Sequence, residues 1–387
     1  MRTVYLDHSA TTYTRDEVLE EMLPYFSEKY GNPNSIHHMG RACKTALNDC
    51  RERVAAALHV KPGEIVFCGG GSEADNQAIK GHAWAMQSKG NHLITSAIEH
   101  HAVLHTVAWL EKRGFSATYL PVDKYGLVNP DDLQKAITDK TILVSIMAGN
   151  NEIGTMQDIP ALAAVCAQSG VTFHTDAVQS LGYHDLHLDR DPIDMMSLSA
   201  HKFYGPKGVG LLFVRSGTRL EPLIHGGEQE RGLRAGTENM PGIVGLTKAL
   251  ELAIEEMPQS VARLSALRDR LIEGVLSGIS ETGLNGHRTK RLPHNASIYF
   301  AGVEGESILL QLDMSGICAS SGSACTSGST TASHVLEAIG LDPLLCHSSI
   351  RFTLGHRTTE EDIEHVLDRL PPVIEKLRAM SAVSKGA

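Results

Sequence analysis

Short apolar runs and amphipathic stretches alternate along the first two thirds of the chain. The apolar runs are rich in β-branched and aromatic residues, a composition that predicts strands. They cover residues 64–68, 92–96, 141–147, 171–175, 194–198 and 209–214. Between them, residues 72–88, 102–113 and 159–168 carry apolar positions at helical spacing. Strands this apolar, when separated by helices, indicate a mostly parallel sheet covered by helices on both faces.

The pattern changes after about residue 242. Long helical patterns over residues 242–256 and 259–277 are followed by short strand patterns at 296–300 and 349–353. An amphipathic helix is predicted over residues 359–380, and the run Thr-Thr-Glu-Glu at its start is typical of a helix N-terminus. We therefore expect two domains, a large α/β domain over residues 13–255 and a smaller α+β domain over residues 256–387 together with residues 1–12.

Composition is that of an ordinary globular protein. Of the 387 residues, 42% are hydrophobic and 21% are charged, which excludes a disordered or fibrous chain. The formal net charge of −10 argues against a general nucleic-acid binder, and no apolar run approaches the roughly 18 residues of a membrane span. The seven cysteines lack CxxC spacing and the 20 histidines lack HExxH spacing, so neither predicts a metal site. A reducing cytoplasmic environment fits this cysteine usage.

Polar clusters follow the predicted strands of the large domain. They are Gly-Gly-Gly-Ser-Glu-Ala-Asp-Asn from residue 69, Glu-His-His-Ala-Val from 99, Gly-Asn-Asn-Glu-Ile-Gly from 149, Asp-Ala-Val-Gln-Ser from 176 and Ser-Ala-His-Lys from 199. Each cluster alone is accounted for by a turn and a helix cap. Because ligands of open α/β sheets bind at the carboxyl ends of the strands, five clusters in succession favour one shared site.

Three of these clusters carry the groups that pyridoxal phosphate requires. The glycines and Ser72 can cradle a phosphate at the start of a helix, although an ordinary strand-to-helix turn explains them equally well. Lys202 follows a buried strand and can form a Schiff base, whereas a single lysine more often faces solvent. Asp176 can pair with the pyridinium nitrogen. The combination favours a pyridoxal-phosphate enzyme.

The motifs His174–Gln179 (HTDAVQ), Ser199–Lys202 (SAHK) and Ser320–Ser329 (SSGSACTSGS) together resemble the cysteine desulfurases of the NifS/IscS group. The similarity runs from Tyr5–Thr12 (YLDHSATT) to Arg351–Gly355 (RFTLG), nearly the whole chain. These are class-V, fold-type-I pyridoxal-phosphate enzymes. The resemblance implies a seven-stranded sheet sandwiched by helices in the large domain, a small α+β domain and a homodimer.

The resemblance also implies a role for each cofactor-binding residue. Lys202 would bond to the cofactor aldehyde and then move the substrate Cα proton, and His100 would stack on the ring, with the neighbouring His101 as the alternative. Asp176 would pair with the ring nitrogen, and Gln179 would hydrogen-bond the ring oxygen. The phosphate would be held by Gly71, Ser72, Ser199 and His201, and by Thr237 of the partner subunit. The family usually has threonine where this chain has Ser72, which keeps the hydroxyl and loses a methyl group.

Substrate binding and sulfur transfer are assigned in the same way. Asn151, which also contacts the cofactor, and Arg351 would hold the carboxylate of L-cysteine. Cys325 lies in a polar run that predicts an exposed loop, and it would accept the substrate sulfur as a persulfide while L-alanine leaves. An iron–sulfur scaffold or another acceptor protein would then take the sulfur. Whether Cys325 also ligates a metal, as an iron–sulfur cluster bound through its persulfide, is left open.

The other cysteines are expected to have structural roles. Cys43, Cys50, Cys166 and Cys68 fit buried, inert thiols. Cys318 is assigned to a strand preceding the Cys325 loop, and Cys346 to a structural position, with a metal or redox role left open.

Three other functions compete with a desulfurase. An aminotransferase on this fold would have no use for Cys325 and would form stoichiometric keto acid, and a selenocysteine lyase would need no different ring contacts. A non-catalytic scaffold would have no reason to keep Lys202, Asp176, His100, Cys325 and Arg351. Absorption near 400 nm, roughly where a protonated Schiff base of the cofactor absorbs, would exclude an empty scaffold.

Overall fold

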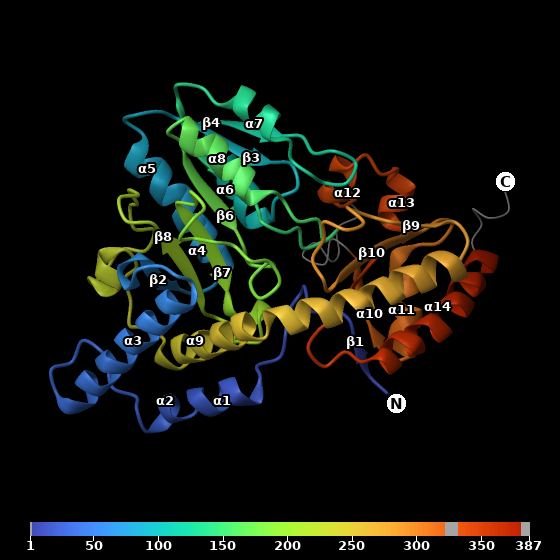
Figure 1. The fold of residues 1–387 in the computed structure, drawn as a ribbon, viewed down its shortest axis with the longest axis horizontal. Coiled ribbons are helices and arrows are strands. Elements are labelled where there is room, and N and C mark those ends of the chain that lie inside the picture. The colour runs from blue at the N-terminus through green and yellow to red at the C-terminus, as the bar shows by residue number, and fades with distance from the viewer. Residues whose placement is uncertain (1, 322–331, 381–387) are drawn as a thin grey trace.

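A seven-stranded sheet forms the centre of the larger part of the molecule (Figure 1). The structure is a computed structural model that describes residues 2–321 and 332–380. Across the sheet the strand order is β2-β8-β7-β6-β5-β3-β4. The strands are β2 (Ile65–Cys68), β3 (His92–Ser96), β4 (Ser116–Leu120), β5 (Thr141–Ser145), β6 (Thr172–Asp176), β7 (Met195–Ser199) and β8 (Gly210–Val214).

Most of this sheet is parallel, as the apolar pattern predicts. The pairs from β4 through β3, β5 and β6 to β7 are parallel, and only β8 runs antiparallel to its neighbours β7 and β2. The predicted fold class is confirmed. The strand patterns anticipate six of the strands but not β4, an edge strand that is only partly buried and lacks a continuous apolar run.

Helices cover the sheet. The predicted helices are present as α4 (Gly71–Asn76), which continues through a π-helical stretch (Gln77–Gly81) into α5 (His82–Met86), and as α6 (His101–Glu111) and α8 (Ile159–Gln168). Four further helices, α1 (Asp16–Met22), α2 (Pro24–Ser27), α3 (His38–Ala57) and α7 (Pro130–Ala136), were not anticipated from the sequence. The buried face of α3 includes Cys43, Leu47 and Val54, which lie in the main core of the large sheet.

A second, antiparallel sheet of four strands has the order β12-β13-β10-β9. Its strands are β9 (Thr282–Leu284), β10 (Asn295–Phe300), β12 (Ser320–Ser321) and β13 (Ser349–Thr353), and beside it β1 (Val4–Tyr5) pairs in parallel with β11 (Ile317–Cys318). The helices of this part are α10 (Met257–Gly278), α11 (Gly305–Met314), α12 (His334–Ala338), α13 (Pro343–His347) and α14 (Glu360–Met380). At the start of α14, Thr359 and Asp362 cap each other reciprocally, so the capping acid is Asp362 rather than a glutamate of the Thr-Thr-Glu-Glu run.

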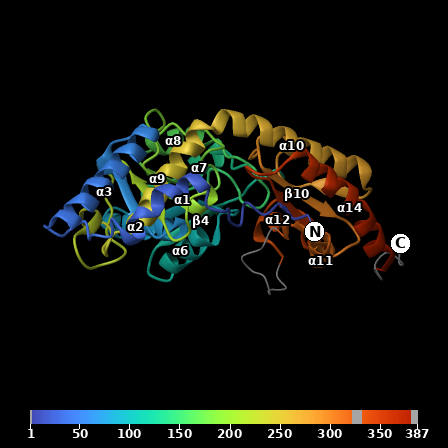
Figure 2. The same ribbon diagram turned by 90° about the horizontal axis from the view of Figure 1, so that it is seen from below.

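The two sheets have largely separate cores. A core of 22 buried residues lies between the small sheet, α10, α11 and α14, and it includes Val4 and Leu6 from the N-terminal strand region. Helix α9 (Met240–Glu255) packs on α1 and α3, and α10 continues from it toward the small sheet, as Figures 1 and 2 show. These separate cores support our proposal that the chain divides at residues 255/256, with residues 1–12 belonging to the small domain.

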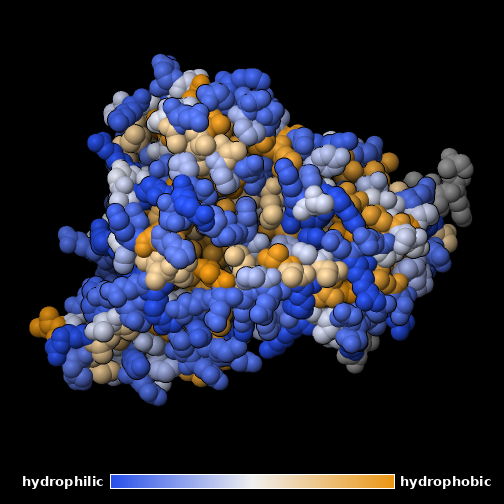
Figure 3. All heavy atoms as spheres, viewed as in Figure 1, coloured by the Kyte–Doolittle hydropathy of each residue, from blue (hydrophilic) through white to orange (hydrophobic). Residues whose placement is uncertain are grey.

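The surface in Figure 3 is mostly hydrophilic, with hydrophobic residues in scattered groups. Within the described ranges, none of the helices combines the length and the apolar character needed to cross a bilayer.

Candidate active site

A cavity of about 350 Å³ lies where several strands of the large sheet end and the small sheet begins. It is lined by side chains from the segments after β3, β5, β6 and β7, from the start of α4, and from β13. The structure thereby brings together ten of the twelve residues singled out from the sequence. They are Gly71, Ser72, His100, Asn151, Asp176, Gln179, Ser199, His201, Lys202 and Arg351.

Lys202 lies at the end of a short 3₁₀ turn that follows β7. Its Nζ donates hydrogen bonds to the carbonyl oxygen of Ala10, at 2.8 Å, and to that of Ser9. The Nε2 of Gln179 donates to the same Ser9 oxygen over 2.9 Å. The N-terminal segment after β1 therefore holds the lysine amine inside the cavity, beside a buried carboxylate.

That carboxylate is Asp176, the last residue of β6, which is 5% exposed. One of its oxygens accepts the backbone amide of Val178 at 2.9 Å. Burial raises the pKa of Asp176, while the Val178 amide and nearby Lys202 lower it. The carboxyl of Asp75 also lines the cavity, and burial followed by the charge of Asp176 holds the pKa of Asp75 well above its usual range. The two neighbouring carboxyls of Asp75 and Asp176 therefore favour binding of a cationic group in the cavity, which would stabilise the Asp176 carboxylate.

Another wall of the cavity is formed where the chain turns from β2 into α4, at three consecutive glycines. Gly70 has a φ of +152°, in the region that favours glycine. A Cβ added to Gly71 would lie 2.8 Å from Cγ2 of Val178, so a larger residue there would displace that wall. The first amides of a helix have no partner within the helix, and here Ser72 and the buried Ser199 hydroxyl stand beside them. This wall can bind an anion.

The two histidines after β3 differ in their surroundings. The Nδ1 of His100 accepts the backbone amide of Ala102 at 3.1 Å, which leaves Nε2 to carry the proton of the neutral ring. Burial, and next the charge of Lys202, lowers the pKa of His100 to about 4. His101 instead stacks on His105, with ring centroids 4.8 Å apart, and lies equally close to His334. The environment of His100 fits a neutral ring facing the cofactor.

Arg351 occupies the small-sheet side of the cavity and is 3% exposed. Its Nη1 donates to the carbonyl oxygen of Asn151 at 3.1 Å, and its Nη2 donates to Asp7. Its Nε is buried and has no hydrogen-bond partner among the described residues. A guanidinium fixed in this way can bind a carboxylate.

Two predicted residues lie outside the cavity. Thr237 is exposed on the surface of the large domain, between Gly236 and the start of α9. Such a position permits contact with a partner subunit but does not test it. Cys325 lies outside the described residues, between Ser321 and Ala332. Cys43, Cys50, Cys68 and Cys166 are buried as expected, Cys318 ends β11, and Cys346 is a buried residue of α13.

Sequence reasoning overlooked two buried acids, Glu99 and Glu152. Oε1 of Glu99 accepts the Ser96 hydroxyl at 2.5 Å and the Met147 amide at 3.0 Å, and burial raises its pKa to about 8. Burial also raises the pKa of Glu152 to about 7. Both stand in clusters that the sequence marks as unusual, directly before His100 and directly after Asn151. Only their burial shows that they belong to the cavity wall.

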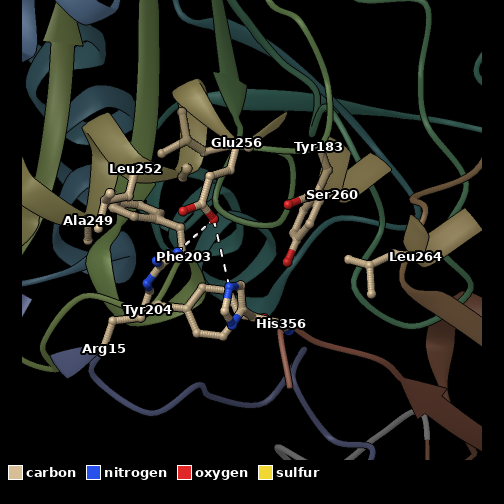
Figure 4. Close-up of a pocket in the computed structure, with 13 residues that line it drawn as sticks. Arg15, Tyr183, Phe203, Tyr204, Ala249, Leu252, Glu256, Ser260, Leu264 and His356 are labelled. Atoms are coloured by element: carbon tan, nitrogen blue, oxygen red, sulfur yellow. Dashed lines mark hydrogen bonds and ion pairs between the residues drawn. The ribbon is translucent and has the colours of Figure 1, made fainter. Parts of the chain in front are cut away.

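A small pocket of about 30 Å³ lies behind the lysine turn, where Phe203 and Tyr204 meet the junction of α9 and α10 (Figure 4). Arg15 donates to Glu256 over 2.7 Å, and Glu256 lies 3.9 Å from Nε2 of His356. This pocket is large enough for about one water molecule. The contacts of Glu256 with Arg15 and His356 join the large and small parts of the molecule. The pocket is not part of the active site.

Comparison with known proteins identifies the family. The model of the aminotransferase class-V family matches residues 4–366. The chain is 54% identical over 382 residues to a protein of Clostridium botulinum named cysteine desulfurase IscS, covering 98% of this chain and 96% of that protein. The chain belongs to the cysteine desulfurase group of the class-V aminotransferase family. The predicted group and enzyme class are thereby confirmed.

Solved structures agree with this assignment. A protein described as NifS-like superposes on this desulfurase-group chain with a TM-score of 0.92 and 38% identity, over 97% of this chain and all of the other. A second structure, described as SspA in complex with cysteine, has a TM-score of 0.81 and 38% identity, over 91% of this chain and 99% of the other.

The residues of the cavity fit pyridoxal phosphate, the cofactor of this family. The buried Asp176 carboxylate matches a pyridinium nitrogen, and the wall at Gly71 and Ser72 matches a phosphate. Lys202 lines the same cavity, where its amine donates to the carbonyl oxygen of Ala10. Each of the three groups that the cofactor requires thus has a counterpart in this one cavity.

Proposed function

We propose that this protein is a pyridoxal-phosphate-dependent L-cysteine desulfurase that forms L-alanine and a persulfide on Cys325. The observation that carries the proposal is the common cavity of Lys202, Asp176 and Arg351, three residues that the family's chemistry needs together. When bound, the cofactor supplies an electron-poor ring that stabilises negative charge developing at the substrate Cα. The protein residues then have three tasks, namely to bind the substrate, to move its proton and to accept its sulfur.

Arg351 and Asn151 orient the substrate. The buried guanidinium binds the carboxylate of L-cysteine, and the Asn151 carbonyl oxygen fixes the guanidinium by accepting a hydrogen bond from it. In this orientation the substrate Cα faces the amine of Lys202, which removes the Cα proton. The neutral His100 ring, held by its bond to the Ala102 amide, covers the cofactor face. Gly71, Ser72, Ser199 and His201 would hold the phosphate, Gln179 would hydrogen-bond the ring oxygen, and Thr237 would complete the phosphate site from the partner subunit of a homodimer.

Sulfur transfer completes the reaction. The thiolate of Cys325 attacks the sulfur of the bound cysteine, an S–S bond forms, and the substrate Cβ–S bond breaks. The electron pair of the broken bond stays with the three-carbon product, which takes up a proton and leaves as L-alanine. The balance is L-cysteine plus Cys325 thiol to L-alanine plus Cys325 persulfide. An iron–sulfur scaffold or another acceptor protein in the cytoplasm then takes the outer sulfur.

Replacing Cys325 with serine tests this proposal. Serine is nearly isosteric, but its hydroxyl stays protonated near pH 8 and is a poor nucleophile toward sulfur. Cys325→Ser should bind the cofactor and change its absorption spectrum on addition of L-cysteine, while alanine formation falls to background. Only the wild-type chain should gain one sulfur by intact mass, removable with dithiothreitol. Alanine and sulfide formation by the variant at the wild-type rate would refute the assignment, and Cys318 and Cys346 would be tested next.

A further inference from the structure

The carboxyl group of Glu152 is buried in the cavity wall and has a defined partner in the small domain. Glu152 is 6% exposed, and its Oε2 accepts the hydroxyl of Ser333 at 2.5 Å. Ser333 is equally buried and stands 181 positions later in the chain. A buried hydroxyl–carboxyl bond of this kind fixes both groups, because neither can turn to water instead.

The backbone around Glu152 is fixed from two sides. Oδ1 of the fully buried Asn150 accepts the amides of Glu152, at 2.8 Å, and Ile153, at 2.9 Å, and its Nδ2 donates to the carbonyl oxygen of Ile98. From the small sheet, Nδ2 of Asn295 donates to the carbonyl oxygen of Glu152 at 3.3 Å. Glu152 is therefore a rigid point to which another element can be attached.

That element is the short helix α12. Ser333 is its N-cap and accepts the amides of Val335 and Leu336 at 3.2 and 3.3 Å while it donates to Glu152. Apolar side chains of α12 pack with Ile98 and Ile153 of the large domain in a small separate core, and Figure 1 shows α12 beside the loops of that domain. A five-residue helix is marginal by itself, so its position depends on this cap and this contact.

Ser333, the N-cap of α12, lies eight positions after Cys325 in the sequence. Eight residues span at most about 28 Å, so the place of Ser333 limits where the thiol can act. Ser333 itself lies at the cavity through its bond to Glu152, and the next residue, His334, lines it. The Glu152–Ser333 bond thus fixes Ser333, eight positions after Cys325, at the cavity.

We propose that Glu152 is a positioning residue for sulfur transfer. Through its bond to Ser333 it fixes, at the cavity, the point from which the chain leads back to Cys325. The proposal rests on the proposed function, in which Cys325 accepts the sulfur. It predicts that Glu152 affects the transfer step and leaves cofactor binding and the response to substrate intact.

The test compares holoenzyme variants Glu152→Ala, Glu152→Gln and Ser333→Ala in single turnovers with L-cysteine. Two signals are followed: the change of cofactor absorption and the gain of one sulfur on Cys325 by intact mass. Glu152→Ala and Ser333→Ala should change absorption at the wild-type rate but gain sulfur about five- to thirtyfold more slowly. Glu152→Gln should stay within about twofold of wild type, because its amide oxygen still accepts the hydroxyl. The double alanine variant should be no slower than the slower single variant.

Hydrogen exchange of the Val335 and Leu336 amides supplies a readout that does not depend on activity, and it should accelerate in both alanine variants. Glu64→Ala, which removes a buried carboxyl at the end of β2 opposite the Gly71 turn, is the matched control and should keep the wild-type ratio of the two signals. A wild-type rate of sulfur gain in Glu152→Ala, an equal slowing of both signals, or unchanged amide exchange would overturn the proposal. If Glu152→Ala does not fold, Ser333→Ala decides. If wild type itself gains no sulfur on Cys325, the proposed function fails. Amide exchange then still tests whether the Glu152–Ser333 bond stabilises the start of α12.

Discussion

Arg351 donates from Nη2 to Oδ1 of Asp7 across 2.9 Å, although the two residues stand 344 positions apart. Strand pairing in the small domain brings these two residues together, because Asp7 forms a β-bridge with Thr353 on the strand that carries Arg351. The N-terminal segment therefore builds two parts of the cavity, since its Ser9 and Ala10 carbonyls hold Lys202 and its Asp7 orients the guanidinium. Asp7 is a positioning residue for Arg351.

Replacing Arg351 with alanine should weaken substrate binding and spare cofactor binding. A charge-assisted pair to the substrate carboxylate is lost, so the KM for L-cysteine should rise about 10- to 100-fold. The cofactor absorption of the unliganded enzyme should not change, because the groups matched to its ring and phosphate lie on the large domain. Steady-state kinetics and absorption spectra check both parts. Arg357→Ala is the control, since that arginine is exposed, pairs with Asp16 and lies over the Tyr13 ring outside the cavity, and its KM should be that of wild type.

Lys202→Ala should abolish the covalent link between chain and cofactor. The variant should fold, because it loses side-chain bonds to two carbonyl oxygens, each worth about 1 kcal/mol. Borohydride reduction followed by intact mass should show the cofactor on the wild-type chain and none on the variant. Lys207→Ala, whose Nζ donates to the Thr12 carbonyl oxygen outside the cavity, should keep the link. A reduced adduct on Lys202→Ala would assign the link to another lysine.

The fold and most of the cavity followed from the sequence because parallel strands end at one edge of a sheet. Clusters after β3, β5, β6 and β7 meet there whatever the details of packing, and the family resemblance supplied Arg351. Glu99 and Glu152 could not be predicted, since an acid gains its role from burial and from partners such as Ser333, which no local pattern reveals. Helix α3 was missed although its buried residues Cys43, Leu47, Cys50 and Val54 recur at helical spacing, and it packs mainly on α9.

Buried histidines should make the protein sensitive to acid, and His294 offers a test. It is 2% exposed, its Nδ1 has no hydrogen-bond partner among the described residues, and burial lowers its pKa to about 3. Between pH 6.5 and 3 the unfolded chain binds this proton and the folded chain does not, so stability falls as the pH falls. His294→Asn should therefore lose about 2 kcal/mol less than wild type between pH 7 and pH 5 in denaturant unfolding. The exposed His38→Asn should lose as much as wild type, and a parallel loss in His294→Asn would refute the argument.

Thr237 gives the last prediction, because its exposed position outside the cavity agrees with a role in the partner's site. In a homodimer with shared sites, a Thr237→Ala chain and a Lys202→Ala chain should each be impaired alone. A heterodimer of the two contains one site with the intact lysine of the first chain and the intact threonine of the second. Isolated heterodimers, purified with two different tags, should therefore regain activity at one of their two sites, up to about half the wild-type rate per dimer. The control pairs Thr237→Ala with a chain that carries both substitutions, which keeps one lysine but no threonine and should show only the residual activity of one Thr237→Ala site. Verified heterodimers of the first kind with no more activity than this control would show that Thr237 serves its own subunit.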